Sequence, residues 1–204
     1  MGRVSDAKEK LMEAVTELIW TGSYDGTTID QICERAGVKK GSFYYFFDNK
    51  AQLAEAALDR EWENYRPDLD AMFSASISPL QRIENFCEYT YRDQVQLKEK
   101  YGFALGCPLC TLGSEVSTQE QGLRKKVQEM MDQHMKYMET AVRDAIAAGE
   151  IPPGDAKVKS RMIHAYFLGL MTEVRIANSL DALKDAMAAV REMLGVSAVE
   201  PVAR

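Results

Sequence analysis

Hydrophobic residues recur along this chain with the three-to-four-residue spacing of α-helices, and no stretch alternates apolar and polar residues for long. Leu11, Val15, Leu18 and Ile19 fall on one face of a helix within residues 5–21. A longer segment, about 118–148, carries an apolar residue at every third or fourth position. No βαβ pattern interrupts this periodicity, so the sequence predicts an all-α fold.

Caps and breakers divide the pattern into separate helices. Thr28 and Gln31 have the spacing of a capping box, which predicts a short helix ending at Ala36–Gly37. The runs GSYDG and GEIPPG predict turns at 22–26 and 149–154. The other helices are expected at about 5–21, 40–47, 48–73, 78–100, 118–148, 155–179 and 181–194, with a short or kinked helix within 102–113 and a frayed tail over the last eight residues.

Composition agrees with a globular protein. The chain has 204 residues, 46% of them hydrophobic and 27% charged, which fits one large or two small domains and argues against disorder. No apolar run is long enough to span a membrane, and the N-terminus MGRVSDAKEKL is unlike a signal peptide. We therefore expect a cytoplasmic protein without membrane association, whose four cysteines are free thiols.

The overall charge of −6 argues weakly against nucleic-acid binding, but the charge is unevenly distributed. Residues 35–50 contain Arg35, Lys39, Lys40 and Lys50 against a single acidic residue. Binding to DNA requires a local positive surface rather than a positive protein. This segment therefore stays a candidate for DNA binding.

Two short helices in this segment are separated only by Gly37-Val38-Lys39, which is the helix-turn-helix arrangement. The second helix of such a motif can enter the major groove of DNA. Here it begins with two lysines, which can contact phosphates, and continues with five aromatic residues. Three phenylalanines are expected in the core and two tyrosines near DNA: Phe43, Phe46 and Phe47, then Tyr44 and Tyr45. The alternative is an aromatic plug between helices with solvated lysines.

Residues 11–53, which include TTIDQICERAGVKKGSFYYFFDNKAQL, resemble the N-terminal head of the TetR family of transcriptional regulators. The resemblance implies a three-helix helix-turn-helix head, here residues 1–50, and a larger helical domain for dimerisation and effector binding, here residues 51–204. It implies no enzymatic activity and no cofactor. It implies a homodimeric repressor that binds a double-stranded DNA operator and is released by a small-molecule effector.

The positions that contact DNA in the family are occupied here by Thr28, Lys40, Gly41, Ser42, Tyr44, Tyr45 and Lys50. Lys50 begins the fourth helix, where its charge and nearby amides favour a phosphate. Two positions depart from the family pattern. Lys39 replaces a common serine or threonine, and its charge can take over the phosphate contact. Phe46 replaces a common histidine or tyrosine and gives a contact up.

The last two predicted helices carry apolar stripes. Leu180, Leu183, Met187, Val190 and Leu194 repeat as a heptad seam, and the preceding helix has a matching stripe. Two such hairpins, one from each subunit, would form a four-helix dimer interface; alternatively, the stripes face the core of their own domain. The predicted interface residues are Phe167, Leu170, Val174, Leu183, Met187, Val190 and Leu194.

The middle of the chain is rich in aromatic and methionine side chains, which suit an adaptable pocket for an apolar effector and suit an ordinary core equally well. The candidate effector-binding residues are Trp62, Tyr65, Phe86, Tyr89, Phe103, Cys107, Met131, His134, Met138 and Tyr166. No metal site is expected, since His134 has no second ligand four residues away.

Cys107 and Cys110 form a C-x-x-C motif with an internal proline. A thiol oxidoreductase would normally place this motif on a helix after a strand, and a zinc site would need two further ligands. The GCPLC run also resembles the Gly-Cys segment of TetR-type regulators that sense oxidants or electrophiles. Two interpretations stay open: small packing residues, or a sensor thiol at Cys107 with Cys110 as its resolving partner.

Overall fold

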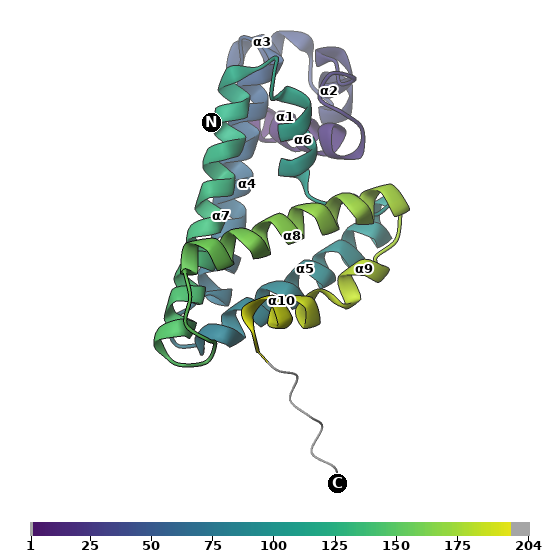
Figure 1. Ribbon diagram of the computed structural model, residues 1–204. Helices are drawn as coiled ribbons and strands as arrows, with labels where there is room; N and C mark the ends of the chain where they lie inside the picture. Colours follow the sequence, from purple (N-terminus) through teal and green to yellow (C-terminus); the bar gives the residue numbers. More distant parts are fainter. Residues whose placement is uncertain (1, 197–204) are drawn as a thin grey trace. The chain divides into compact units, whose positions relative to one another are not determined.

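The computed structural model describes residues 2–196, in which every regular element is a helix, so the all-α prediction is confirmed (Figure 1). The predicted tail at 197–204 lies outside the described residues. The helices are α1 (Gly2–Thr21), α2 (Ile29–Ala36), α3 (Lys40–Phe46), α4 (Lys50–Met72), α5 (Pro79–Tyr101), α6 (Pro108–Val116), α7 (Gln121–Ala147), α8 (Ala156–Ala177), α9 (Asp181–Lys184) and α10 (Ala186–Leu194). None of the helices described here combines the length and hydrophobicity that a bilayer span needs.

The chain folds into two compact units that do not follow its order. The first unit runs to Pro67 and also includes Pro108–Met131. It therefore combines α1–α3 and most of α4 with α6 and the beginning of α7. The second unit contains Asp68–Cys107 and the chain from Asp132 onward.

The core of the first unit forms where the apolar faces of its helices meet. Leu11 and Val15 of α1 are fully buried, as the three-to-four spacing predicts, and so are Ile32 of α2 and Phe43 of α3. Leu123, near the start of α7, is fully buried in the same unit. The helix-turn-helix segment thus shares a compact unit with residues almost a hundred positions further along the chain.

The second unit has its own core, built from α5, the end of α7, α8 and the last two helices. Its most deeply buried side chains include Ile83, Val142, Ile163, Val174 and Leu194. The predicted helix at 181–194 is interrupted at Asp185, which caps the C-terminus of α9 and the N-terminus of α10 with φ −96° and ψ 0°. The 102–113 segment is short helix as predicted, since α6 begins at Pro108 after an irregular stretch.

Candidate nucleic-acid interface

The start of α2 is fixed by the predicted capping box. The Gln31 amide donates to Thr28 Oγ1 at 3.3 Å, and the Thr28 amide donates to Gln31 Oε1 at 2.8 Å. These reciprocal bonds satisfy two backbone donors that a helix N-terminus would otherwise leave unpaired. Thr28 is exposed and so combines this structural role with a surface position.

The end of α2 is set by Gly37 in the left-handed region, with φ +65°. The Gly37 amide donates to the Glu34 carbonyl at 3.1 Å, and the Val38 amide donates to the Cys33 carbonyl at 3.0 Å. This is the Schellman arrangement, which ends a helix and redirects the chain within two residues. The predicted tight turn between α2 and α3 is therefore present.

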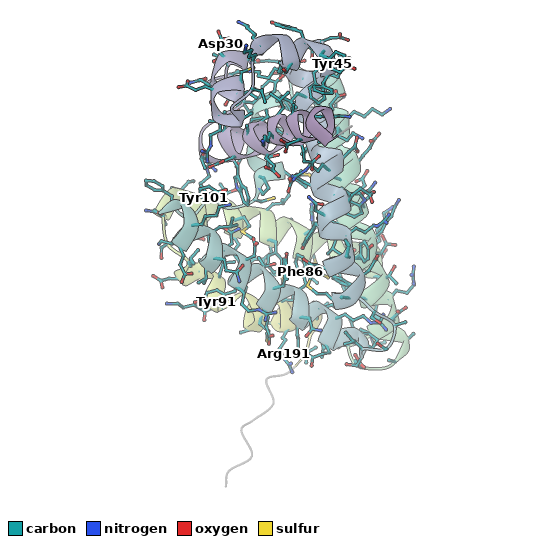
Figure 2. The ribbon with its side chains drawn as sticks, turned by 180° about the vertical axis from the view of Figure 1, so that it is seen from behind. Asp30, Tyr45, Phe86, Tyr91, Tyr101 and Arg191 are labelled. Carbon is teal, nitrogen blue, oxygen red and sulfur yellow. The ribbon has the colours of Figure 1, made fainter. Side chains whose placement is uncertain are left out.

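The aromatic side chains of α3 and of Phe47, its C-cap, divide as the sequence predicts except at Phe46, which was expected in the core. Phe43 and Phe47 are buried and Phe46 is half-buried, whereas Tyr44 is 54% exposed and Tyr45 73% exposed. Tyr45 lies at the surface of the first unit (Figure 2). The two exposed tyrosines are held by edge-to-face ring contacts with the neighbouring phenylalanines, at centroid distances of 5.2 and 4.8 Å. The helix thus presents two aromatic hydroxyls from a rigid apolar base.

The basic residues around α3 differ in their surroundings. Lys40 Nζ lies 2.7 Å from Asp30 Oδ1, and this hydrogen bond raises the pKa of Lys40. Arg35 binds Glu17 of α1 through two nitrogens, at 2.6 and 3.0 Å. Lys39 is exposed at the N-cap of α3, where its side chain makes no capping bond. Lys39 and Lys40 therefore supply the exposed positive charge at this end of α3.

Lys50 has a different environment from the other predicted DNA contacts. Its ammonium donates to the backbone carbonyls of Tyr24 at 2.6 Å and Thr27 at 2.9 Å, and lies 4.0 Å from the centre of the Tyr24 ring. Burial lowers the pKa of Lys50. Neither Tyr24 nor Glu115 was predicted from the sequence; the Glu115 carboxylate accepts a hydrogen bond from the Tyr24 amide at 2.8 Å. The one sequence feature that could have indicated this contact is a tyrosine inside the otherwise polar run GSYDG.

The candidate effector-binding residues fall in both units. Trp62, Tyr65 and Met131 belong to the first unit, and the others to the second. In the second unit, Phe86 packs edge-to-face on Phe167 at a centroid distance of 5.2 Å, and the ring of Tyr166 lies 5.8 Å from that of Phe167.

The remaining candidates in the second unit differ in exposure. Met138 is buried, whereas Phe103 is 63% exposed and contributes little to an enclosed site. Tyr89, whose hydroxyl donates to Asp68 at 3.4 Å, has its pKa raised to about 12, mainly by burial. Cys107 and His134 are half-buried.

The predicted dimer seam lies in the core of its own unit. Six of its seven side chains are buried within a single chain, and Met187 alone is half-buried. Val174 and Leu194, for example, are fully buried. A side chain that is enclosed by its own chain cannot also be the surface that a second subunit contacts. The structure thus favours the alternative that these stripes face their own core.

The four thiols fall into two classes. Cys33 and Cys87 are buried, and burial raises the pKa of both, that of Cys87 to about 12. Cys107 and Cys110 are half-buried. Among the described residues, no three histidine, cysteine or carboxylate side chains gather as a metal site.

The backbone before Cys107 is held by side chains of α5 and α8. The Gly106 amide donates to Gln94 Oε1 at 3.0 Å, and Arg175 donates to the Leu105 carbonyl at 2.9 Å. Gly106 has φ +67°, and a Cβ there would clash with the Met171 carbonyl. Cys107 therefore follows a fixed backbone segment rather than a loose loop.

Comparison with known proteins agrees with this geometry. Residues 11–57 match the family described as "Bacterial regulatory proteins, tetR family", and residues 79–190 match "Tetracyclin repressor-like, C-terminal domain". An uncharacterized HTH-type regulator from Lactococcus lactis is 27% identical over 92% of this chain and 96% of its own length. The HTH-type transcriptional repressor NemR of Escherichia coli is 23% identical over 95% of this chain and 96% of its own.

Solved structures show the same fold. A TetR transcriptional regulator from Chloroflexus aurantiacus superposes with a TM-score of 0.81 at 26% identity, covering 96% of this chain and 97% of its own. The reduced form of E. coli NemR gives a TM-score of 0.81 at 23% identity, with 95% and 100% coverage. The head and the C-terminal helices are thus both matched over nearly their full length. The chain is a DNA-binding, non-enzymatic member of the TetR family of transcriptional regulators.

Proposed function

We propose that this regulator is a homodimeric repressor whose α3 reads an operator in the major groove. The observation that carries the proposal is the division of residues 43–47 into buried or half-buried phenylalanines and exposed tyrosines. Phosphates are bound by Lys39 and Lys40, and bases or phosphates by the hydroxyls of Ser42, Tyr44 and Tyr45. Gly41 allows close backbone approach, since nothing lies within 4 Å of the position of a Cβ there. Thr28 contacts a phosphate from the start of α2.

Repression is supported by the names of relatives. NemR of E. coli is a transcriptional repressor, and IcaR of Staphylococcus epidermidis, 25% identical over 81% of this chain and 80% of its own, is a negative transcriptional regulator. Selection of duplexes from a random pool on the full-length protein tests the DNA-binding part. Enrichment of one pseudo-palindromic sequence is expected, and a pool without any enriched sequence after several rounds would contradict an operator-specific repressor.

The dimer forms through the exposed face of α8. Six positions on this helix are spaced four and three residues apart in strict alternation, as in a coiled-coil seam: Val158, Met162, Ala165, Gly169, Thr172 and Ile176. Val158 is 53% exposed, Met162 49% and Ile176 81%, which is unusual for apolar side chains on a monomer. A second copy of the chain covers this stripe, and Gly169, with open space around it, lets the two helices approach closely.

The dimer matches the expected operator. Two recognition helices bind half-sites about 34–36 Å apart, one turn of DNA, so a two-fold symmetric protein selects a pseudo-palindrome. Each half-site alone binds weakly, and the affinity for the whole operator depends on the dimer.

A small apolar or thiol-reactive effector releases the protein from DNA. The aromatic cluster around Phe86 and Phe167 supplies apolar side chains in the second unit, and Cys107 is a half-buried thiol of the same unit. A thiol-dependent effect is supported by the solved structure of the relative NemR, which is that of its reduced form. By linkage, the effector acts only through a difference in its affinity for the DNA-bound and released conformations.

N-ethylmaleimide serves as the test probe for the thiol-reactive part. Treatment should release the parent protein from its selected operator, and the Cys107→Ser variant should stay bound. The matched control is Cys110→Ser, which reports whether Cys110 takes part. Equal release of the parent and the Cys107→Ser variant would contradict a sensor role for Cys107.

A further inference from the structure

The loop between α1 and α2 is bound by charged side chains from elsewhere in the first unit. Its central residue, Tyr24, is only 3% exposed although it lies in a polar, glycine-containing turn. The Tyr24 amide donates to Glu115 Oε2 at 2.8 Å, and the Asp25 amide donates to Glu115 Oε1 at 2.7 Å. One carboxylate at the C-terminal end of α6 thus satisfies two successive backbone donors of the loop.

The carbonyl groups of the same loop are satisfied from α4. Lys50 Nζ binds the carbonyls of Tyr24 and Thr27 and lies over the Tyr24 ring. Thr27 itself turns back to donate its hydroxyl to the Ser23 carbonyl at 2.6 Å. The loop is therefore held on its donor side by an acid and on its acceptor side by a base, and these charge-assisted hydrogen bonds are stronger than neutral ones.

The negative charges around Lys50 oppose its contact with a DNA phosphate. The negative charges of Asp25, Glu115 and Glu120 act on the Lys50 ammonium and favour its charged form. A phosphate brought to this position would meet three carboxylates for one ammonium, so electrostatic repulsion would oppose its approach. Lys39 and Lys40 differ, because both are exposed and only Asp30 is paired with them in the described structure.

We propose that Lys50 and Glu115 are positioning residues for DNA binding, and that Lys50 neutralises no phosphate. The loop that they fix leads directly into Thr28 and the capping box, and therefore sets where α2 begins. The hydrogen-bonded turn at Gly37 then fixes the position of α3 relative to α2. The inference rests on DNA binding by this family, and it does not depend on the effector or on repression.

The salt dependence of binding separates the two roles of a lysine. A phosphate contact releases about one counter-ion, so removing it lowers the slope of log Kd against log salt by about one. Lys50→Met should weaken binding of the full-length protein to the selected duplex about tenfold, because loop carbonyls lose a charged partner, and should leave this slope unchanged. Lys39→Met is the matched control and should lower the slope by about one.

Glu115→Gln gives a second, independent readout. If Glu115 acted only through its charge, removing a negative group near DNA would tighten binding. A positioning role predicts weaker binding, again about tenfold, because a glutamine oxygen can accept only one of the two amides well. Hydrogen exchange at the Tyr24 and Asp25 amides should accelerate in this variant, while the α3 amides keep their protection.

Both variants are measured at a temperature where circular dichroism shows the parent helicity, so that unfolding does not mimic lost affinity. The reference is the parent protein bound to its selected duplex. A slope lowered by one in Lys50→Met would make Lys50 a phosphate contact and overturn the proposal. Binding of Glu115→Gln as tight as that of the parent, or tighter, would overturn it as well.

Discussion

At the scale of single residues, the exposed side chains of α3 have separable tasks. Lys40 offers a charge, whereas Tyr44 offers a ring and a hydroxyl fixed against Phe43. A charge attracts any phosphate, but a fixed aromatic group has to fit particular bases. The loss of affinity on removing Tyr44 should therefore depend on the DNA sequence, whereas the loss on removing Lys40 should not.

Lys40→Ala should weaken binding to the operator and to random duplexes by a similar factor, and lower the salt slope by about one. The exposed pair with Asp30 does not oppose this, because exposed ion pairs exchange readily for a stronger anion. Tyr44→Ala should weaken operator binding more than random binding. Fluorescence anisotropy over a salt series checks both, and operator binding indistinguishable from the parent in both variants would remove α3 from the interface.

The cysteines should react in an order set by burial. At pH 8, Cys107 and Cys110 should label with iodoacetamide in the native protein, whereas Cys87 should label only after unfolding. The pKa of Cys87, raised by burial from 9.0 to about 12, leaves about a thousandfold less thiolate near neutral pH than an unshifted thiol would give. Mass spectrometry of peptides follows each site. Native labelling of Cys87 at the rate of Cys107 would contradict the structure.

The raised pKa of Cys87 also sets the direction in which stability changes with pH. The folded state holds the Cys87 proton more tightly than the unfolded state, so the free energy of unfolding falls as the pH rises above about 9. Tyr89, with a pKa raised to about 12, acts in the same direction at slightly higher pH. Urea titrations between pH 8 and 11 should show this decline, and a smaller decline in Cys87→Ala.

At the scale of elements, the ends of α2 and α3 contain two glycines with opposite requirements. Gly37 has φ +65°, where a side chain costs about 1–2 kcal/mol even though space is open around it. Gly37→Ala should therefore lower the free energy of unfolding by about that amount. Gly41 is a helical residue with equally open space, so Gly41→Ala should raise it by about 0.5–1 kcal/mol.

Gly41→Ala should have the opposite effect on DNA binding. The added methyl group stabilises α3 but stands where the backbone is proposed to approach DNA, so Gly41→Ala should bind the operator more weakly than the parent. Thermal melts and anisotropy on the same samples separate the two effects. A Gly41→Ala variant with parent affinity would place α3 further from the DNA backbone than proposed.

Elements were predicted well wherever the information is local. The capping box of Thr28 and the turn at Gly37 depend on residues within a few positions, and both are present as predicted. A heptad stripe indicates only that one helix face is covered, without naming the partner, so Val190 and its neighbours were assigned to a second subunit rather than to their own core. Likewise, Lys50 matched a family position, but Glu115, which binds the same α1–α2 loop, lies 65 positions further along the chain, and no local pattern reveals it.

At the scale of the whole molecule, the proposed dimer depends on the exposed stripe on α8. Met162→Glu combined with Ile176→Glu would place unpaired carboxylates in an apolar interface, which is costly. The double variant should sediment as a monomer with parent helicity, and its operator affinity should collapse. Gln96→Glu, an exposed change on α5, is the control and should stay dimeric. A dimeric double variant would place the interface on another face.

The composition of the first compact unit limits how regulators of this kind can be recombined. Its helix-turn-helix segment is completed by α6 and by the beginning of α7, which follow after an excursion of about forty residues through the second unit. A chimera that exchanges residues 1–50 alone would separate the α1–α2 loop from Glu115 and Leu123 from the core it fills. Transplanting DNA specificity into another regulator therefore requires two non-adjacent cassettes, or an acceptor that already carries a matching acid on α6.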